Sequence, residues 1–191
     1  MRRVILQMGV SLDGFVARVD GKHEWGYHGE DEAHRRWKLD ALHSAGAHLM
    51  GRVTYEEMVT VWPTSTSEIA APMNAIPKVV FSRTLETADW PDTTIARGDL
   101  ADEIAEIKRQ PGADVIAHGG ATFAGALCRL GLVDEYRLLV HPAALGNGLA
   151  LFSRLQSPLF VELAESHSYN TGAVLNIYRP RPGSSDGNAV W

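Results

Sequence analysis

The sequence predicts an α/β fold with a mainly parallel sheet covered by helices on both faces. Apolar, β-branched runs such as Val4–Val10 and Lys78–Ser82 have the length of buried strands. Helical patterns, for example Glu30–Ala45, alternate with such runs through most of the chain. Near the end of the chain two strand patterns follow each other directly. They are joined by Asn170-Thr-Gly172, which is typical of a β-hairpin. The C-terminal edge of the sheet is therefore predicted to be antiparallel.

The remaining elements follow in chain order. Ser11–Gly14 is predicted to be a turn, 19–29 a loop, and the helix that begins at Glu30 can be ended by Gly46. Asp99 is a predicted N-cap for the helix that follows it. Further strands are expected at 47–51, 93–96, 114–118, 135–140, 159–167 and 173–178, and further helices at 54–61, 69–75, 100–107 and 122–130. Residues 1–180 are predicted to form one domain and 181–191 a flexible polar tail.

Composition narrows the class of protein. The chain has 191 residues, 45% hydrophobic and 21% charged, which is typical of one globular domain. A net charge of −5 argues against a broad nucleic-acid-binding surface. One cysteine, Cys128, excludes an internal disulfide, and its helical apolar context predicts a buried core thiol. No signal-peptide pattern and no run of about 18 apolar residues occurs, so we expect a cytoplasmic protein with no membrane partner.

The segment Ala47–Met58 carries the most informative pattern. A short strand is followed by Gly51-Arg52 and then by a helix, for which the Thr54 and Glu57 spacing predicts a capping box that starts at Thr54. A helix start carries unpaired N–H groups and partial positive charge, which suit an anion, and arginine adds a fork that matches phosphate. An ordinary strand–helix joint with a surface arginine explains this segment alone equally well.

Two later joints favour the anion site. Ser82-Arg83 follows the strand ending at Phe81, and Gly119-Gly120 separates a strand from a helix start. Ligands of open α/β sheets bind beyond the carboxyl ends of the strands, where all three joints are expected. Paired glycines let backbone N–H groups approach a pyrophosphate. The G-x-G-x-x-G and G-x-x-x-x-G-K-[ST] motifs are absent, which argues against a standard Rossmann domain and a P-loop ATPase.

With these joints the chain resembles the dihydrofolate reductase superfamily, in the branch that contains the reductase domain of riboflavin biosynthesis. The resemblance covers about residues 3–180. It rests on Ser11-Leu-Asp-Gly14, Leu49–Glu57, Val80-Phe-Ser-Arg83, Gly119-Gly120, Leu132–Glu135 with His141-Pro142, and Leu145–Gly148 with Leu151-Phe152. It implies a three-layer αβα sandwich with a mostly parallel mixed sheet, NADPH as hydride donor, and a homodimer.

The resemblance also implies roles for single residues. It implies that the cofactor phosphates are bound by Gly51, Arg52, Val53 and Thr54, and that the adenosine 2′-phosphate site is lined by Ser82 and Arg83. The pyrophosphate is then contacted by Gly119, Gly120, Ala121 and Thr122, and the nicotinamide is approached by Val10 and Ser11. Phe81 and His118, which precede two of these joints, complete the expected cofactor site. The implied activity is hydride transfer to a small planar heterocyclic or carbonyl/imine substrate.

The substrate side of the site is less defined by the sequence. Folate enzymes carry an acid on their first long helix, and no acid matches that position cleanly here, so Asp13, Glu24 and Asp31 are the candidates for proton transfer. Trp25 can stack on a planar substrate or anchor its loop, and Trp62 can wall the same pocket or pack on the core. The missing acid leaves open a non-catalytic NADP(H)-binding protein.

Two other classes of site are disfavoured. The histidines lack H-x-x-x-H or H-E-x-x-H spacing, so no bound metal is expected. No G-x-S-x-G elbow occurs, which argues against a serine hydrolase.

Overall fold

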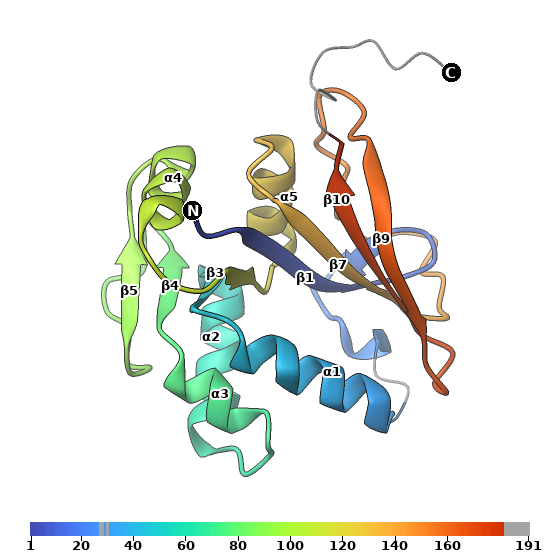
Figure 1. Cartoon of the computed structure of the whole chain (residues 1–191), viewed down its shortest axis with the longest axis horizontal. Helices are drawn as coiled ribbons and strands as arrows, with labels where there is room; N and C mark the ends of the chain where they lie inside the picture. Colours follow the sequence, from blue (N-terminus) through green and yellow to red (C-terminus); the bar gives the residue numbers. More distant parts are fainter. Residues whose placement is uncertain (27–28, 30, 182–191) are drawn as a thin grey trace.

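The computed structural model describes residues 1–26, 29 and 31–181 and is built on one large sheet. The sheet has eight strands in the order β5-β4-β3-β6-β1-β7-β10-β9 (Figure 1). The strands are β1 (Val4–Val10), β3 (Ala47–Gly51), β4 (Lys78–Phe81), β5 (Thr93–Ala96), β6 (Val115–Ala117), β7 (Glu135–Val140), β9 (Val161–Ser168) and β10 (Val174–Pro180).

Strand direction confirms the predicted mixed sheet. The ladders that join β5, β4, β3, β6, β1 and β7 are all parallel. β10 is antiparallel to both β7 and β9, and the β9–β10 hairpin turns through Gly172, whose φ of +81° favours glycine. The carboxyl ends of the six parallel strands therefore lie along one edge of the sheet.

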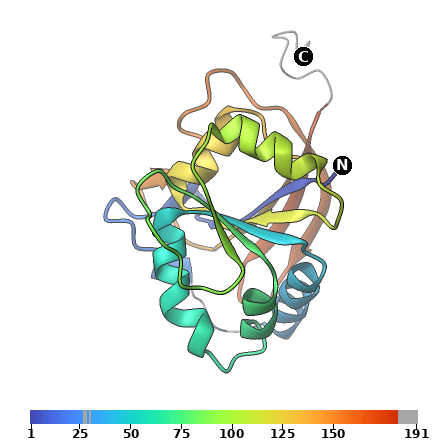
Figure 2. The same ribbon diagram turned by 90° about the vertical axis from the view of Figure 1, so that its left-hand side faces the viewer.

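Helices cover both faces of the sheet, which confirms the αβα sandwich (Figures 1 and 2). One face carries α1 (Glu32–His43), α2 (Arg52–Val61) and α3 (Ala70–Ala75), and the other carries α4 (Leu100–Arg109) and α5 (Ala121–Arg129). Strand residues alternate between the two layers: Leu49 packs with α4 and α5, whereas Met50 packs with α1 and α2. Cys128 is buried in the α5 layer, as predicted, and burial raises the pKa of its thiol to about 12.

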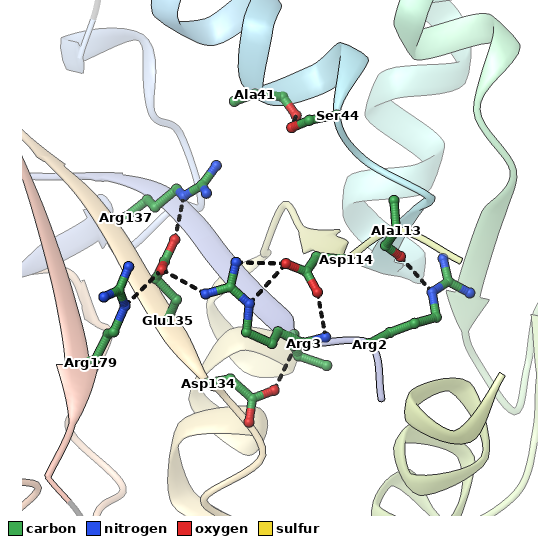
Figure 3. A network of polar contacts seen from close by, with 11 residues as sticks. Arg2, Arg3, Ala41, Ser44, Ala113, Asp114, Asp134, Glu135, Arg137 and Arg179 are labelled. Carbon is green, nitrogen blue, oxygen red and sulfur yellow. Dashed lines mark hydrogen bonds and ion pairs between the residues drawn. The ribbon is translucent and has the colours of Figure 1, made fainter. Parts of the chain in front are cut away.

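A charged network holds the amino ends of the strands together (Figure 3). The Glu135 side chain is 3% exposed and accepts hydrogen bonds from Arg3 at 3.2 Å, Arg137 at 2.9 Å and Arg179 at 3.1 Å. Burial raises the pKa of the Glu135 carboxyl, but the guanidinium groups outweigh it and the net pKa is lowered. Arg3 also pairs with Asp114 at 2.7 Å. The network joins the amino ends of β1, β6 and β7 to the carboxyl end of the antiparallel strand β10.

Several predicted boundaries differ from the structure. α1 begins at Glu32 rather than Glu30, which lies outside the described residues, because Asp31 is the N-cap and accepts from the His34 N–H at 3.0 Å. α1 ends at His43, before Gly46. The Asp99 cap of α4 is confirmed, since its carboxylate accepts from the Ala101 N–H at 2.8 Å.

The predicted capping box at Thr54 is wrong. α2 begins two residues earlier, at Arg52, and Gly51 stands at its N-cap without a side-chain bond. The Thr54 hydroxyl instead bonds to another segment of the chain, 66 residues away in sequence.

The sequence also missed two very short strands and two short helices. β2 (Phe15–Ala17) and β8 (Leu149–Ala150) form a separate two-stranded sheet. The 3₁₀ turns η1 (Glu24–Gly26) and η2 (Trp62–Thr64) follow β2 and α2. The predicted tail at 181–191 lies, apart from Arg181, outside the described residues.

Candidate active site

The predicted cofactor residues gather at the carboxyl edge of the sheet. They follow four neighbouring strands, β4, β3, β6 and β1, which the sheet places side by side. By strand they are Phe81, Ser82 and Arg83 at β4; Gly51, Arg52, Val53 and Thr54 at β3; His118, Gly119, Gly120, Ala121 and Thr122 at β6; and Val10 and Ser11 at β1. Residues separated by up to 112 positions thus meet on one edge.

A hydrogen bond joins two of the three joints. The Gly120 N–H donates to the Thr54 Oγ1 at 2.5 Å, and the Gly51 N–H donates to the Gly119 carbonyl at 3.3 Å. Neither α2 nor α5 has a side-chain cap at its start. Two helix N-termini with unsatisfied N–H groups therefore lie next to each other, an arrangement that suits a polyanion.

Glycine is required at this joint by geometry. Gly119 has φ of +96°, and a Cβ there would lie 2.7 Å from the Met8 Cε. A Cβ on Gly120 would lie 3.1 Å from the Thr54 Oγ1. The backbone is thus bare where a pyrophosphate would approach, and the residues present fit that group.

The two arginines are available to a ligand. The Arg52 Nη1 pairs with both Glu56 carboxylate oxygens at 2.8 Å, in an exposed i,i+4 pair of a kind that contributes only about 0.3–0.5 kcal/mol. Arg83 is exposed and forms no hydrogen bond or ion pair with any described residue. The Ser82 Oγ accepts from the Leu85 N–H at 2.9 Å and so shapes the turn that presents Arg83.

Two of the three candidate acids are engaged in holding loops. Asp13 accepts from the Ser11 Oγ at 2.6 Å and from the backbone N–H groups of Leu145 and Gly146, and these bonds lower the pKa of its carboxyl to about 2. Asp31 accepts from His34 and from the Asn170 N–H at 2.7 Å, which lowers its pKa as well. Both carboxylates are ionised at neutral pH and are poor proton donors there.

The other substrate-side candidates lie in two places, Glu24 and Trp25 on η1 and Trp62 on η2. Glu24 is exposed on η1. The Trp25 ring contacts the edge of the His141 ring at 5.7 Å, so this tryptophan lies near the end of β7. Trp62 packs against the core cluster under α1 and α2, which matches the core alternative for that residue.

The predicted residue His118 has a polar partner that the sequence did not identify, and Gln7 of β1 is a further polar side chain that it did not identify. The His118 Nε2 lies 2.8 Å from the His48 Nδ1 on the neighbouring strand β3. The Gln7 Oε1 on β1 is buried without a hydrogen-bond partner among the described residues. A hollow of about 320 Å³ beside the start of α5 adds Phe15, Gly148 and Arg154. The alternation of side chains along the two strands could have indicated that His48 and His118 face the same side of the sheet, but only if the order of the strands were known.

In residues 1–26, 29 and 31–181, no group of three or more His, Cys, Asp or Glu side chains is arranged to hold a metal ion. None of the helices in these residues has the length and apolar character needed to cross a bilayer.

The fold is dihydrofolate reductase-like. The structure of dihydrofolate reductase from Enterococcus faecalis complexed with NADP(H) matches with a TM-score of 0.62 at 13% identity, over 94% of this chain and 96% of that one. Residues 2–175 match the family model of the RibD C-terminal domain, and the chain belongs to that family.

Further solved structures share the fold, and a Bacillus protein is similar in sequence. A proposed riboflavin biosynthesis protein from Shewanella sp. PV-4 matches with a TM-score of 0.77 at 21% identity, over 95% of this chain and 99% of that one. A deaminase/5-amino-6-(5-phosphoribosylamino)uracil reductase from Thermotoga maritima gives 0.69 at 18% identity, over 94% of this chain and 57% of that one. The uncharacterized protein YyaP of Bacillus subtilis (strain 168) is 28% identical, over 93% of this chain and 94% of its own.

Proposed function

We propose that the protein is an NADPH-dependent reductase that transfers a hydride to a small planar heterocyclic or carbonyl/imine substrate. The observation that supports this most is the Gly120–Thr54 bond, which sets two uncapped helix starts beside each other. NADPH, when bound, supplies the hydride. Family membership and the NADP(H)-bound dihydrofolate reductase of the same fold support a nicotinamide cofactor.

The residues of the chain then bind and orient the reactants. Backbone N–H groups at Gly51–Thr54 and Gly119–Thr122 hold the phosphates, and Arg52 and Arg83 supply positive charge for a 2′-phosphate. Val10 and Ser11 at the end of β1 approach the nicotinamide. Val10 is buried and Ser11 is fixed by its bond to Asp13, so this part of the site is rigid. Fixed orientation and exclusion of water are the contributions expected of the protein.

The preference of the protein for NADPH over NADH tests the proposed function. A fluorescence titration should show tighter binding of NADPH than of NADH. Arg52→Ala and Arg83→Ala should each weaken NADPH at least tenfold, about 1.4 kcal/mol, and leave NADH nearly unchanged. Arg109→Ala is the matched control, because Arg109 also pairs with an acid on its own helix, Glu106 of α4, far from the joints. Equal losses for both nucleotides would contradict the 2′-phosphate assignment, and no binding of either nucleotide would refute the function.

A second candidate is a non-catalytic NADP(H)-binding protein. The engagement of Asp13 and Asp31 in loop-holding hydrogen bonds favours it, because neither acid is free to donate a proton. The two candidates differ in turnover. NADPH oxidation would be followed with dihydrofolate, ribosylaminouracil phosphates, imines and quinones. NADPH binding without turnover of any of them favours the second candidate.

A further inference from the structure

A stripe of basic side chains on α1 faces the sheet near its carboxyl edge. His34 and Lys38 are one helical turn apart, and Ala41 and Leu42 follow one turn later. Ala41 and Leu42 are buried against Ile116 of β6 in one core cluster. The face of α1 that packs on the sheet thus changes from apolar at its C-terminal half to basic at its N-terminal half.

Two neutral histidines lie opposite this stripe. His118 follows Ile116 by two residues, so its side chain points to the same face of the sheet, toward α1. Its Nε2 shares a hydrogen bond of 2.8 Å with His48. Burial lowers the pKa of both rings, and nearby Lys78 adds to the effect on His48, whose pKa is about 4. The pair therefore carries no charge at neutral pH.

Lys38 is the charged group of this cluster. It lies one helical turn after His34, whose ring packs on Tyr169, and one turn before Leu42, which packs on the sheet. Burial lowers the pKa of the His34 and His118 rings, and the positive charge of Lys38 lowers it further. No described residue offers the Lys38 ammonium a hydrogen bond or an ion pair, and burial lowers its pKa. The acid at the start of α1, Asp31, is held by His34 and Asn170 instead.

In the part of the chain that the structure describes, the elements packed against α1 supply no other negative charge to compensate the Lys38 ammonium. The β9–β10 hairpin contributes Tyr169, whose ring packs on His34 at 4.9 Å, while β6 and β3 contribute the neutral histidines. Among the described groups around it, Lys38 thus remains a partly buried cation without an anion. Contact with a negatively charged or strongly polar oxygen stabilises such a group.

We propose that Lys38 binds the oxygen of the substrate, a carbonyl or anionic oxygen on a small planar ring. This rests on the proposed reductase function and narrows its substrate class. An iminium substrate is disfavoured, because its positive charge would approach an uncompensated ammonium. A hydride acceptor whose oxygen gains negative charge during reduction is favoured, because the ammonium stabilises that charge.

The small number of lysines permits a direct test. The chain has four, Lys22, Lys38, Lys78 and Lys108, so lysine labelled with ¹³C at Cε gives four NMR signals. The full chain would be titrated from pH 6 to pH 11 alone, with benzoate and with benzamide, each with and without NADP⁺. Benzoate should raise the pKa of Lys38 by about one unit, a tenfold preference for the charged lysine. Benzamide, which is neutral and has the same shape, should move it much less.

Controls separate binding from general charge effects. Lys108 already pairs with Asp134 at 2.7 Å, so its signal should not respond to benzoate. Lys38→Met should remove the responsive signal and abolish benzoate binding, whereas Lys38→Arg should retain binding. A Lys38 signal that ignores benzoate, or that responds equally to benzamide, overturns the proposal.

A failure of the Lys38 assignment is distinguishable from a failure of the proposed reductase function. Lys38 lies outside the phosphate-binding joints, so Lys38→Met should bind NADPH within about twofold of the unaltered chain in a fluorescence titration. Loss of NADPH binding by the unaltered chain would refute the reductase. An unresponsive Lys38 in a chain that binds NADPH normally would refute only the assignment of Lys38.

Discussion

Replacing Thr54 with valine tests the link between the two helix starts. Valine keeps the shape of threonine and replaces the hydroxyl that accepts from the Gly120 N–H at 2.5 Å. Thr54 is only 7% exposed, so water reaches the orphaned N–H poorly. An unsatisfied buried donor costs about 1–3 kcal/mol, and we expect a loss of about 2 kcal/mol in the free energy of unfolding. For a chain of this length that corresponds to a decrease in Tm of roughly 4–8 °C.

Urea unfolding followed by tryptophan fluorescence measures the loss, and NADPH titration measures its effect on the site. The dissociation constant should rise about tenfold, because the two sets of N–H groups lose their fixed spacing. Thr60→Val is the matched control on the same helix. The Thr60 hydroxyl donates to the Glu57 carbonyl at 2.7 Å in an exposed position, and its loss should change stability by less than about 0.5 kcal/mol. Equal stability and equal NADPH affinity in the two variants would refute the reasoning.

Three further substitutions probe other features. Gly119→Ala should destabilise the protein by about 1–2 kcal/mol in urea unfolding, since φ of +96° opposes a Cβ while the flexible end of the Met8 side chain can move aside. Gly131→Ala, with φ of +64° and open space, should cost about the same, and a much larger loss at Gly119 would show that Met8 does not yield. Glu135→Gln should cost about 2 kcal/mol in the same assay, because three guanidinium groups lose their shared carboxylate, and an unchanged midpoint would show that the network is dispensable. Burial lowers the pKa of His48 to about 4 in the folded chain, against an ordinary value of 6.5. Between these two values the unfolded chain binds one more proton, so the free energy of unfolding should fall as pH decreases from about 6.5 to 4. His48→Gln should flatten this pH dependence, and an unchanged slope would contradict the role of His48.

Long apolar patterns made much of the fold predictable. The strands Val4–Val10, Thr93–Ala96 and Glu135–Val140 have the predicted bounds, because each is rich in apolar or β-branched residues, although Thr93–Ala96 is a partly exposed edge strand. β2 and β8 were missed because two or three residues are too short to show a period.

Residues of the candidate site could be predicted where the whole sequence pattern lies within one segment of the chain. Gly51-Arg52 and Gly119-Gly120 lie at strand ends, as expected, because each joint is local. The role of Thr54 was misassigned since its spacing to Glu57 fits a local cap, whereas its actual partner is brought near only by the β3–β6 pairing. Lys38 could not be identified from its sequence neighbours, because its significance depends on β6 lying under α1.

The Gly120–Thr54 bond has a consequence for the lifetime of the protein. It holds the starts of α2 and α5 together, and each helix start carries a partial charge of roughly +0.5. The two ends repel each other, and the dinucleotide that we propose to bind between them would relieve the repulsion. Ligand that binds only the folded chain stabilises it by RT ln(1 + [L]/Kd), about 2.7 kcal/mol at a hundredfold excess over Kd. The supply of reduced nucleotide would then set how long the chain survives proteolysis as well as how fast it turns over.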